Sequence, residues 1–169
     1  AAGLTEHPLG KERFALASEL LGRDLAAICA GEATGELSDL NDTRNTQPAL
    51  FVVEYALAKQ FEAWGLRPSA MLGHSLGELV AACLGGIYSL DEGLRLVAIR
   101  SRLMQKCEPG SMLAVSMPLE DLKELLPEEL DLAAVNSNKR NVVAGPTDEI
   151  ERFAAFLKTK KVSSQALAT

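Results

Sequence analysis

The sequence places a serine between two glycines directly after a short apolar run, in the segment Gly73-His74-Ser75-Leu76-Gly77. This G-x-S-x-G pattern is typical of a nucleophile elbow, in which a serine sits on a sharp turn between a strand and a helix. The glycines give the backbone room, and the following helix N-terminus favours developing negative charge. The backbone N–H of Leu76 can donate to an oxyanion. The pattern therefore indicates nucleophilic acyl chemistry at Ser75.

The same serine also has a simpler interpretation. Ser75 and Glu78 form an S-x-x-E pair, which is the sequence signature of a capping box at a helix N-terminus. Capping does not explain glycines on both sides of the serine immediately after an apolar run, so the nucleophile interpretation is favoured. The two interpretations can hold together, since Glu78 can support the helix start while Ser75 faces a substrate.

A second position that could do chemistry is an arginine on the helix expected over residues 90–107. The residues three and four positions from Arg100 are apolar: Leu96, Val97, Leu103 and Met104. That spacing places the Arg100 guanidinium on the inward face, whereas Arg95 and Arg102 belong to the polar face. An inward arginine needs an anion, which is either a core carboxylate in a buried ion pair or the carboxylate of a substrate.

Composition excludes several other classes of function. The 169 residues carry 17 Lys+Arg and 23 Asp+Glu, a formal net charge of −6, which argues against a nucleic-acid or membrane-surface protein. The longest uncharged stretch, residues 79–90, is too short to cross a bilayer. The first ten residues lack a secretory pattern. The cysteines, Cys29, Cys83 and Cys107, form no CxxC motif, so we expect reduced thiols in a cytoplasmic protein and no metal site.

The part of the chain before the elbow is expected to be helical. Apolar spacing predicts two short helices within residues 11–30, broken at Gly22, and then a loop over residues 31–45. A long helix follows, with Thr46 as its cap and Pro48 in its first turn. Its apolar residues form one stripe: Leu50, Val53, Leu57, Phe61 and Trp64.

Around the elbow, we expect a strand over residues 70–72 and a helix over residues 78–84. Ser89 and Glu92 form a capping box that begins the next helix. The short strand is the only convincing one within residues 1–108, and a strand needs neighbours to pair its backbone groups. The sequence therefore predicts that residues 1–108 are the central part of a subdomain whose other strands come from outside these 169 residues.

Beyond Pro109-Gly110 the hydrophobic period changes. The pattern predicts the order βαββαβ, over residues 112–115, 119–126, 131–136, 141–144, 148–158 and 162–167. This is the ferredoxin-like split arrangement, which can bury one sheet face under its two helices. Residues 109–169 are therefore expected to form a second, smaller domain.

Several segments in a fixed order resemble one family: TQPALFVVEYALA, GHSLGE, LVAIRSRLM, GSMLAV, and AAVNS with NVVAGP. They resemble the acyltransferase domains of modular polyketide synthases and the malonyl-CoA:acyl carrier protein transacylases of fatty-acid synthesis, along essentially the whole chain. The resemblance implies an α/β fold. It consists of an α/β-hydrolase-like large subdomain, incomplete in this chain, and a ferredoxin-like βαββαβ small subdomain, with the pocket between them.

The resemblance implies a ping-pong transfer in which Ser75 attacks a malonyl-type coenzyme A thioester and passes the acyl group to the phosphopantetheine thiol of an acyl carrier protein. Arg100 matches the carboxylate-binding arginine, Leu76 the oxyanion donor, and Gln47 a residue near the pocket. His74 belongs to the motif but lies too close to Ser75 to turn its ring easily onto the hydroxyl. Leu76 also resembles malonyl-selective members of the family. No bound cofactor or metal is implied, and neighbouring synthase domains are partners if the chain is part of a megasynthase.

Two motifs of the family are missing from these residues. The general-base histidine, in an A-F-H-S-like motif, would follow the last strand, and a second oxyanion contributor, in a G-Q-G motif, would precede Ala1. We therefore expect the chain to be a fragment with poor or absent turnover by itself. The alternatives are a serine hydrolase or thioesterase, and a non-catalytic carrier-protein docking module in which Ser75 only caps.

Overall fold

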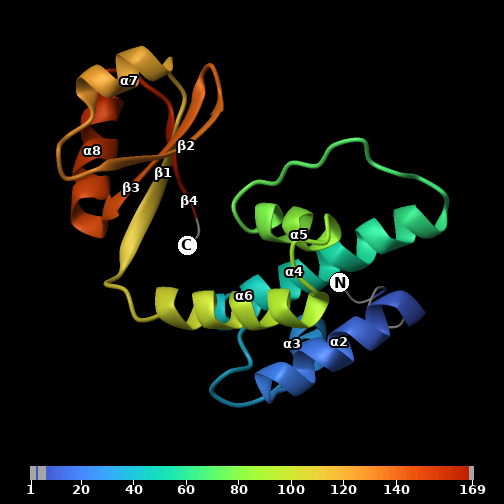
Figure 1. Ribbon diagram of the computed structural model, residues 1–169. Coiled ribbons are helices and arrows are strands. Elements are labelled where there is room, and N and C mark those ends of the chain that lie inside the picture. The colour runs from blue at the N-terminus through green and yellow to red at the C-terminus, as the bar shows by residue number, and fades with distance from the viewer. Residues whose placement is uncertain (1–2, 4–6, 168–169) are drawn as a thin grey trace. The chain divides into compact units, whose positions relative to one another are not determined.

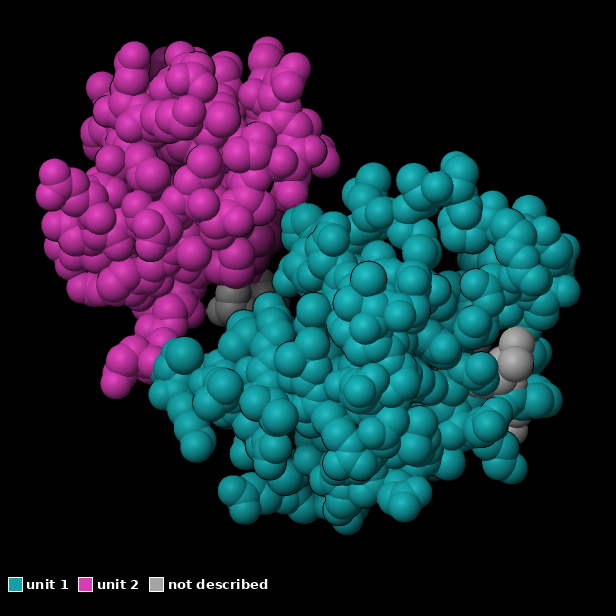
Figure 2. Space-filling model, viewed as in Figure 1, with its two compact units in different colours: residues 1–107 teal, residues 108–169 magenta. Residues whose placement is uncertain are grey.

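The computed structural model describes residue 3 and residues 7–167 (Figure 1). The chain divides into two compact units, residues 1–107 and residues 108–169, of which Figure 2 shows the surfaces. Helices form the regular structure described for the first unit: α2 (Pro8–Leu21), α3 (Leu25–Ala30), α4 (Thr43–Ala63), α5 (Leu76–Leu84) and α6 (Leu90–Met104). The interpretation of this unit as the central part of an α/β-hydrolase-like subdomain stays a prediction.

The predicted break at Gly22 is confirmed. Gly22 has a φ of +67°, a left-handed conformation that ends α2, and α3 begins three residues later. Asp24 caps α3, because its carboxylate accepts a hydrogen bond from the Ala27 N–H at 2.9 Å. The two helices contribute Phe14, Ala17 and Leu25 to the core of the first unit.

The start of α4 lies four residues before the predicted position. Asp42, rather than Thr46, is the N-cap, and its carboxylate accepts a hydrogen bond from the Arg44 N–H at 2.8 Å. The Arg44 side chain pairs with the same carboxylate, and a carboxylate is also favoured by the positive end of the helix. The Thr46 hydroxyl instead donates to carbonyls in the turn before it. Pro48 is consequently inside the helix.

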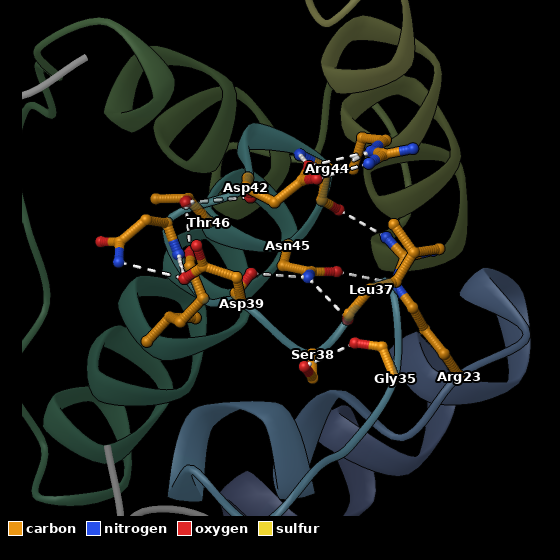
Figure 3. Close-up of polar contacts among 11 residues, drawn as sticks. Arg23, Gly35, Leu37, Ser38, Asp39, Asp42, Arg44, Asn45 and Thr46 are labelled. Atoms are coloured by element: carbon orange, nitrogen blue, oxygen red, sulfur yellow. Dashed lines mark hydrogen bonds and ion pairs between the residues drawn. The ribbon is translucent and has the colours of Figure 1, made fainter.

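Proline inside a helix leaves one carbonyl without its usual partner, and here Arg23 replaces that partner. Pro48 has no N–H for the carbonyl of Arg44, four residues earlier. Arg23 Nη2 donates to this carbonyl at 2.6 Å, and Arg23 Nε donates to Asn45 Oδ1 at 2.7 Å (Figure 3). Asn45 is buried, and its Nδ2 donates at 3.0 and 2.9 Å to the carbonyls of Leu37 and Asp39. These bonds tie the preceding loop to the start of α4.

The predicted apolar stripe of α4 lies mostly on its exposed side. Leu50, Leu57, Phe61 and Trp64 are exposed, and Trp64 retains 67% of its accessible surface. The opposite face of the helix enters the core through smaller and aromatic residues: Ala49, Phe51, Val52 and Ala56.

The predicted strand over residues 70–72 is wrong in this structure. Residues 66–73 have no regular secondary structure, and Leu72 is 90% exposed. A strand exists only when another strand pairs its N–H and C=O groups. Among the described residues, the first unit contains no other strand to do so.

The second unit has the predicted βαββαβ order. Its elements are β1 (Gly110–Val115), α7 (Leu119–Leu125), β2 (Asp131–Ser137), β3 (Arg140–Pro146), α8 (Thr147–Thr159) and β4 (Ser164–Leu167). The sheet order is β2-β3-β1-β4, and all its pairs are antiparallel. The helices pack against the sheet (Figure 1) around a core that includes Leu113, Val143 and Phe153. Both the ferredoxin-like arrangement and the α/β class are therefore as predicted.

In residue 3 and residues 7–167, no helix is both long enough and apolar enough to span a bilayer.

Candidate functional site

Ser75 occupies a strained backbone position at the start of α5. Its φ is 52° and its ψ is −112°, and Lys161 is the only other non-glycine residue with a positive φ among those described. Such a conformation costs a serine about 1–3 kcal/mol and marks tight turns at functional sites. The Ser75 side chain makes no capping hydrogen bond. The capping alternative is therefore wrong, and the helix does not use the hydroxyl.

The turn around Ser75 is closed so tightly that only glycine fits at its first position. A Cβ built on Gly73 would lie 2.0 Å from the Gly77 carbonyl carbon and 2.1 Å from the Glu78 nitrogen. The Gly73 N–H donates to Glu78 Oε1 at 2.8 Å. Glu78 thus holds the turn closed through Gly73 rather than through a capping box with Ser75.

The backbone N–H of Leu76, predicted as an oxyanion donor, lies at the N-terminus of α5, where helix N–H groups have no intrahelical acceptor. Leu76 is the first residue of α5, and its side chain is buried in the core of the first unit. The next two N–H groups of the helix donate to His74 and Ser75 carbonyls at 3.0 and 3.2 Å. The Leu76 N–H has no acceptor among the described residues, so it can donate to an oxygen that develops negative charge.

A hollow of about 550 Å³ lies beside the elbow. Gly73, His74 and Gly77 line it from the elbow, and Glu54 lines it from α4. Burial raises the pKa of the Glu54 carboxyl. Sequence reasoning missed Glu54, although it is a single charge in the apolar segment ALFVVEYALA.

Arg100 and Gln47, predicted separately, contact each other. An Nη1 hydrogen of Arg100 is donated to Gln47 Oε1, and Gln47 is 7% exposed. Gln47 is fixed in turn by α4, because its Nε2 donates to Thr43 Oγ1 at 2.7 Å. The α6 helix that carries Arg100 begins at the predicted capping box of Ser89 and Glu92. Gln47 therefore engages one N–H of the guanidinium, and no other hydrogen bond of Arg100 is found among the described residues.

The alternative of a buried ion pair finds no support at Arg100. In the described part of the chain, no carboxylate lies within ion-pair distance of its guanidinium. Arg95 and Arg102 are exposed as predicted, and Arg95 pairs with Asp91 at 2.7 Å. The prediction that Arg100 lies on an inward face is wrong: of its four apolar neighbours only Val97 is buried, and the other three are 42–59% exposed, namely Leu96, Leu103 and Met104. Neither Arg100 nor Gln47 lines the hollow beside the elbow, so a pocket shared by Ser75 and Arg100 stays a prediction.

The described residues contain no group of three or more His, Cys, Asp or Glu side chains that could hold a metal ion. Cys29, Cys83 and Cys107 are free thiols.

Comparison with protein families gives a match over residues 14–168 to the model described as "Acyl transferase domain". The chain is 43% identical over 120 residues to the mycoketide-CoA synthase of Mycobacterium tuberculosis (strain ATCC 25618 / H37Rv), covering 70% of this chain and 3% of that protein. It is 38% identical over 154 residues to polyketide synthase GfsA of Streptomyces halstedii, covering 85% of this chain and 2% of that protein. The chain therefore spans a small part of these relatives.

Solved structures give the same result at the level of the fold. The acyltransferase domain from the second module of the salinomycin polyketide synthase matches with a TM-score of 0.84 and 33% identity, over 98% of this chain and 40% of that chain. The malonyl-CoA:ACP transacylase of Synechocystis sp. PCC 6803 matches with a TM-score of 0.82 and 31% identity, over 98% of this chain and 55% of that chain. This chain thus belongs to the acyl transferase domain family.

Proposed function

We propose that this chain supplies the nucleophile and the carboxylate-binding arginine of an acyltransferase. The enzyme moves a malonyl-type extender unit from coenzyme A to the phosphopantetheine thiol of an acyl carrier protein. The observation that carries the proposal is the elbow: Ser75 is held in a strained conformation, and its hydroxyl is not used by the helix that follows. Family membership and the solved malonyl transacylase relatives support the same reaction.

In the first half-reaction, Ser75 Oγ attacks the thioester carbonyl carbon. A bond forms between Oγ and carbon, the carbon–sulfur bond breaks, and coenzyme A leaves as its thiol after taking the hydroxyl proton through a general base. The Leu76 N–H donates to the carbonyl oxygen while it carries negative charge. In the second half-reaction, the carrier-protein thiol attacks the acyl-serine and regenerates the hydroxyl.

Arg100 gives the reaction its preference for dicarboxylic acyl groups. A guanidinium with several unused N–H groups binds the free carboxylate of a malonyl group by paired hydrogen bonds. Gln47 holds the guanidinium from one side, so the remaining N–H groups keep a defined direction. Leu76 in the position after the nucleophile agrees with malonyl selectivity.

The partners in this proposal are malonyl-type coenzyme A thioesters and an acyl carrier protein, with further synthase domains if the chain belongs to a megasynthase. One solved relative is described as a type II polyketide synthase acyl carrier protein in complex with its malonyl transacylase. The transfer uses no metal or bound cofactor, since the carrier and the coenzyme are both substrates. The free thiols support a cytoplasmic location, where cysteines stay reduced.

The test is to incubate the protein that carries these residues with malonyl-CoA or acetyl-CoA and to measure its intact mass. We expect an acyl adduct that is lost in Ser75→Ala. Arg100→Ala should reduce malonyl loading and spare acetyl loading. An adduct that survives in Ser75→Ala refutes the nucleophile, and equal loss of both acyl groups in Arg100→Ala refutes the carboxylate contact. Rapid release of free malonate without a carrier protein indicates a hydrolase instead.

A further inference from the structure

A cationic hollow lies where the start of α4 meets the end of α6. Its volume is about 360 Å³, and Arg44, Arg102 and Lys106 line it together with Ile99 and Leu103. A smaller adjoining hollow is lined by Arg102 and by Arg23. We call this set of four basic residues and its apolar wall the cationic hollow. In a protein with a net charge of −6, this concentration of positive charge is unexpected.

The charges of the cationic hollow are only partly neutralised. Asp42 pairs with Arg44, and the negative charges of Asp42 and Glu36 both act on Arg44. Among the described residues, Arg102 and Lys106 have no ion-pair partner. The Arg102 Nε instead donates a hydrogen bond to the Ala98 carbonyl, on its own helix, at 3.2 Å.

Arg23 belongs to the same electrostatic environment. Its guanidinium donates to three neutral acceptors, the carbonyls of Leu21 and Arg44 and Asn45 Oδ1, so these bonds do not neutralise its charge. Figure 3 shows Arg23 beside Arg44 and Asn45. Burial lowers its pKa, and the positive charges of Arg44 and Arg102 lower it further, beyond what Asp42 offsets. A bound anion would relieve this repulsion.

The shape and the wall of the hollow define the chemistry of that anion. Guanidinium groups bind phosphate oxygens by paired hydrogen bonds, and a lysine adds a mobile point charge. Ile99 and Leu103 are 49% and 59% exposed, and they give the hollow an apolar surface on which a flat base can rest. The volume suits a small molecule. A ligand with several phosphates and an apolar ring system fits both features.

We propose that the cationic hollow binds the phosphates of an adenine nucleotide, namely the adenosine 3′,5′-bisphosphate end of coenzyme A. This assignment rests on the proposed function, in which coenzyme A is the acyl donor. The residues that line the hollow are separate from the elbow, so the hollow contributes to binding the donor and not to the bonds that form or break at Ser75.

The first experiment is isothermal titration calorimetry with adenosine 3′,5′-bisphosphate. The double variant R102Q/K106Q should bind about tenfold more weakly, because two phosphate contacts are lost, and the affinity of the unsubstituted protein should fall as salt rises. Arg95→Gln is the matched control, since Arg95 is an exposed cation on the same helix that pairs with Asp91. Its affinity should be unchanged.

Three results would overturn the inference: no binding of the bisphosphate, unchanged affinity in R102Q/K106Q, or an equal loss in Arg95→Gln. Titration with ADP identifies the source of the phosphates. Weaker binding of ADP supports coenzyme A, whereas equal affinity overturns that assignment in favour of a free adenine nucleotide.

A second experiment separates this inference from the proposed function. In R102Q/K106Q, half-maximal acyl loading should require about tenfold more malonyl-CoA. Loading from malonyl-N-acetylcysteamine, a thioester without a nucleotide, should be unchanged. Ser75→Ala should still bind adenosine 3′,5′-bisphosphate. If the unsubstituted protein binds adenosine 3′,5′-bisphosphate but forms no acyl adduct, the proposed acyltransferase is overturned and the cationic hollow is not. If R102Q/K106Q weakens loading from both thioesters equally, the cationic hollow is overturned and the proposed acyltransferase is not.

Discussion

The two glycines on either side of Ser75 are equivalent in the G-x-S-x-G motif but not in the structure. At Gly73, an added Cβ would lie 2.0 Å from the Gly77 carbonyl carbon. At Gly77, the nearest atom to an added Cβ is Glu54 Oε2 at 3.6 Å, which is an ordinary contact. We therefore expect Gly73→Ala and Gly77→Ala to have opposite consequences.

The size of the difference follows from these distances. Non-bonded carbon atoms rest about 3.5–4.0 Å apart, so Gly73→Ala requires a movement of roughly 1.5 Å by backbone atoms. Those atoms belong to the first turn of α5 and to the turn that Glu78 holds closed, and neither can move without breaking hydrogen bonds. We expect a loss of about 3 kcal/mol or an opened elbow. Gly77→Ala lies inside α5, where alanine is favoured over glycine by up to about 1 kcal/mol.

The assay combines urea unfolding, followed by circular dichroism, with acyl loading of Ser75 followed by intact mass. Gly73→Ala should unfold at a lower urea concentration, load too little to detect, or do both. Gly77→Ala should unfold at the same concentration as the unsubstituted protein or at a higher one. Equal unfolding midpoints for the two variants, with normal loading in Gly73→Ala, would falsify the close packing of the turn.

Three further predictions test other contacts by substitution. Arg23→Met removes the donors of three acceptors and should lower the free energy of unfolding by about 2–4 kcal/mol. Adding Pro48→Ala restores a helical N–H and should recover about 1 kcal/mol in a urea double-mutant cycle. Asp42→Ala removes a cap and should cost about 1 kcal/mol at neutral pH. The hydrogen bond from the Arg44 side chain holds the pKa of Asp42 below its ordinary 3.8. The stabilisation by the Asp42 carboxylate is therefore complete above that value and is lost as pH falls through the lowered pKa. Urea denaturation at several pH values should show the difference in unfolding free energy between Asp42→Ala and the unsubstituted protein becoming smaller in acid. Gln47→Leu removes the acceptor that orients the guanidinium, so malonyl loading should fall about fivefold while acetyl loading holds.

Local signals in the sequence predicted those elements whose causes are local. The capping box of Ser89 and Glu92 needs only four consecutive residues, and the structure contains it. The cap of α4 was harder, because the segment DTRNT offers several capping residues. Asp42 is the cap because Arg44 pairs with its carboxylate and Asn45 binds the carbonyl of Leu37 in the preceding loop. The contact with the loop forms only in the folded chain, so the sequence alone does not reveal it.

Features that depend on distant residues could not be predicted in the same way. The apolar run over residues 70–72 was interpreted as a strand, but a strand needs partners that hydrophobicity does not supply. Arg100 and Gln47 were both predicted to lie in the site, but their contact joins residues 53 positions apart. The cationic hollow brings together Arg23 and Lys106, and no motif relates positions so far apart.

The exposed stripe of α4 also provides an internal probe. Trp64, at the end of that stripe, is the single tryptophan of the sequence, and it is 67% exposed. Indole emission moves to shorter wavelength when water is replaced by apolar surface, so the fluorescence of this protein reports directly on whatever covers the stripe. Titration with any polypeptide that packs there should therefore shift the emission without an added label.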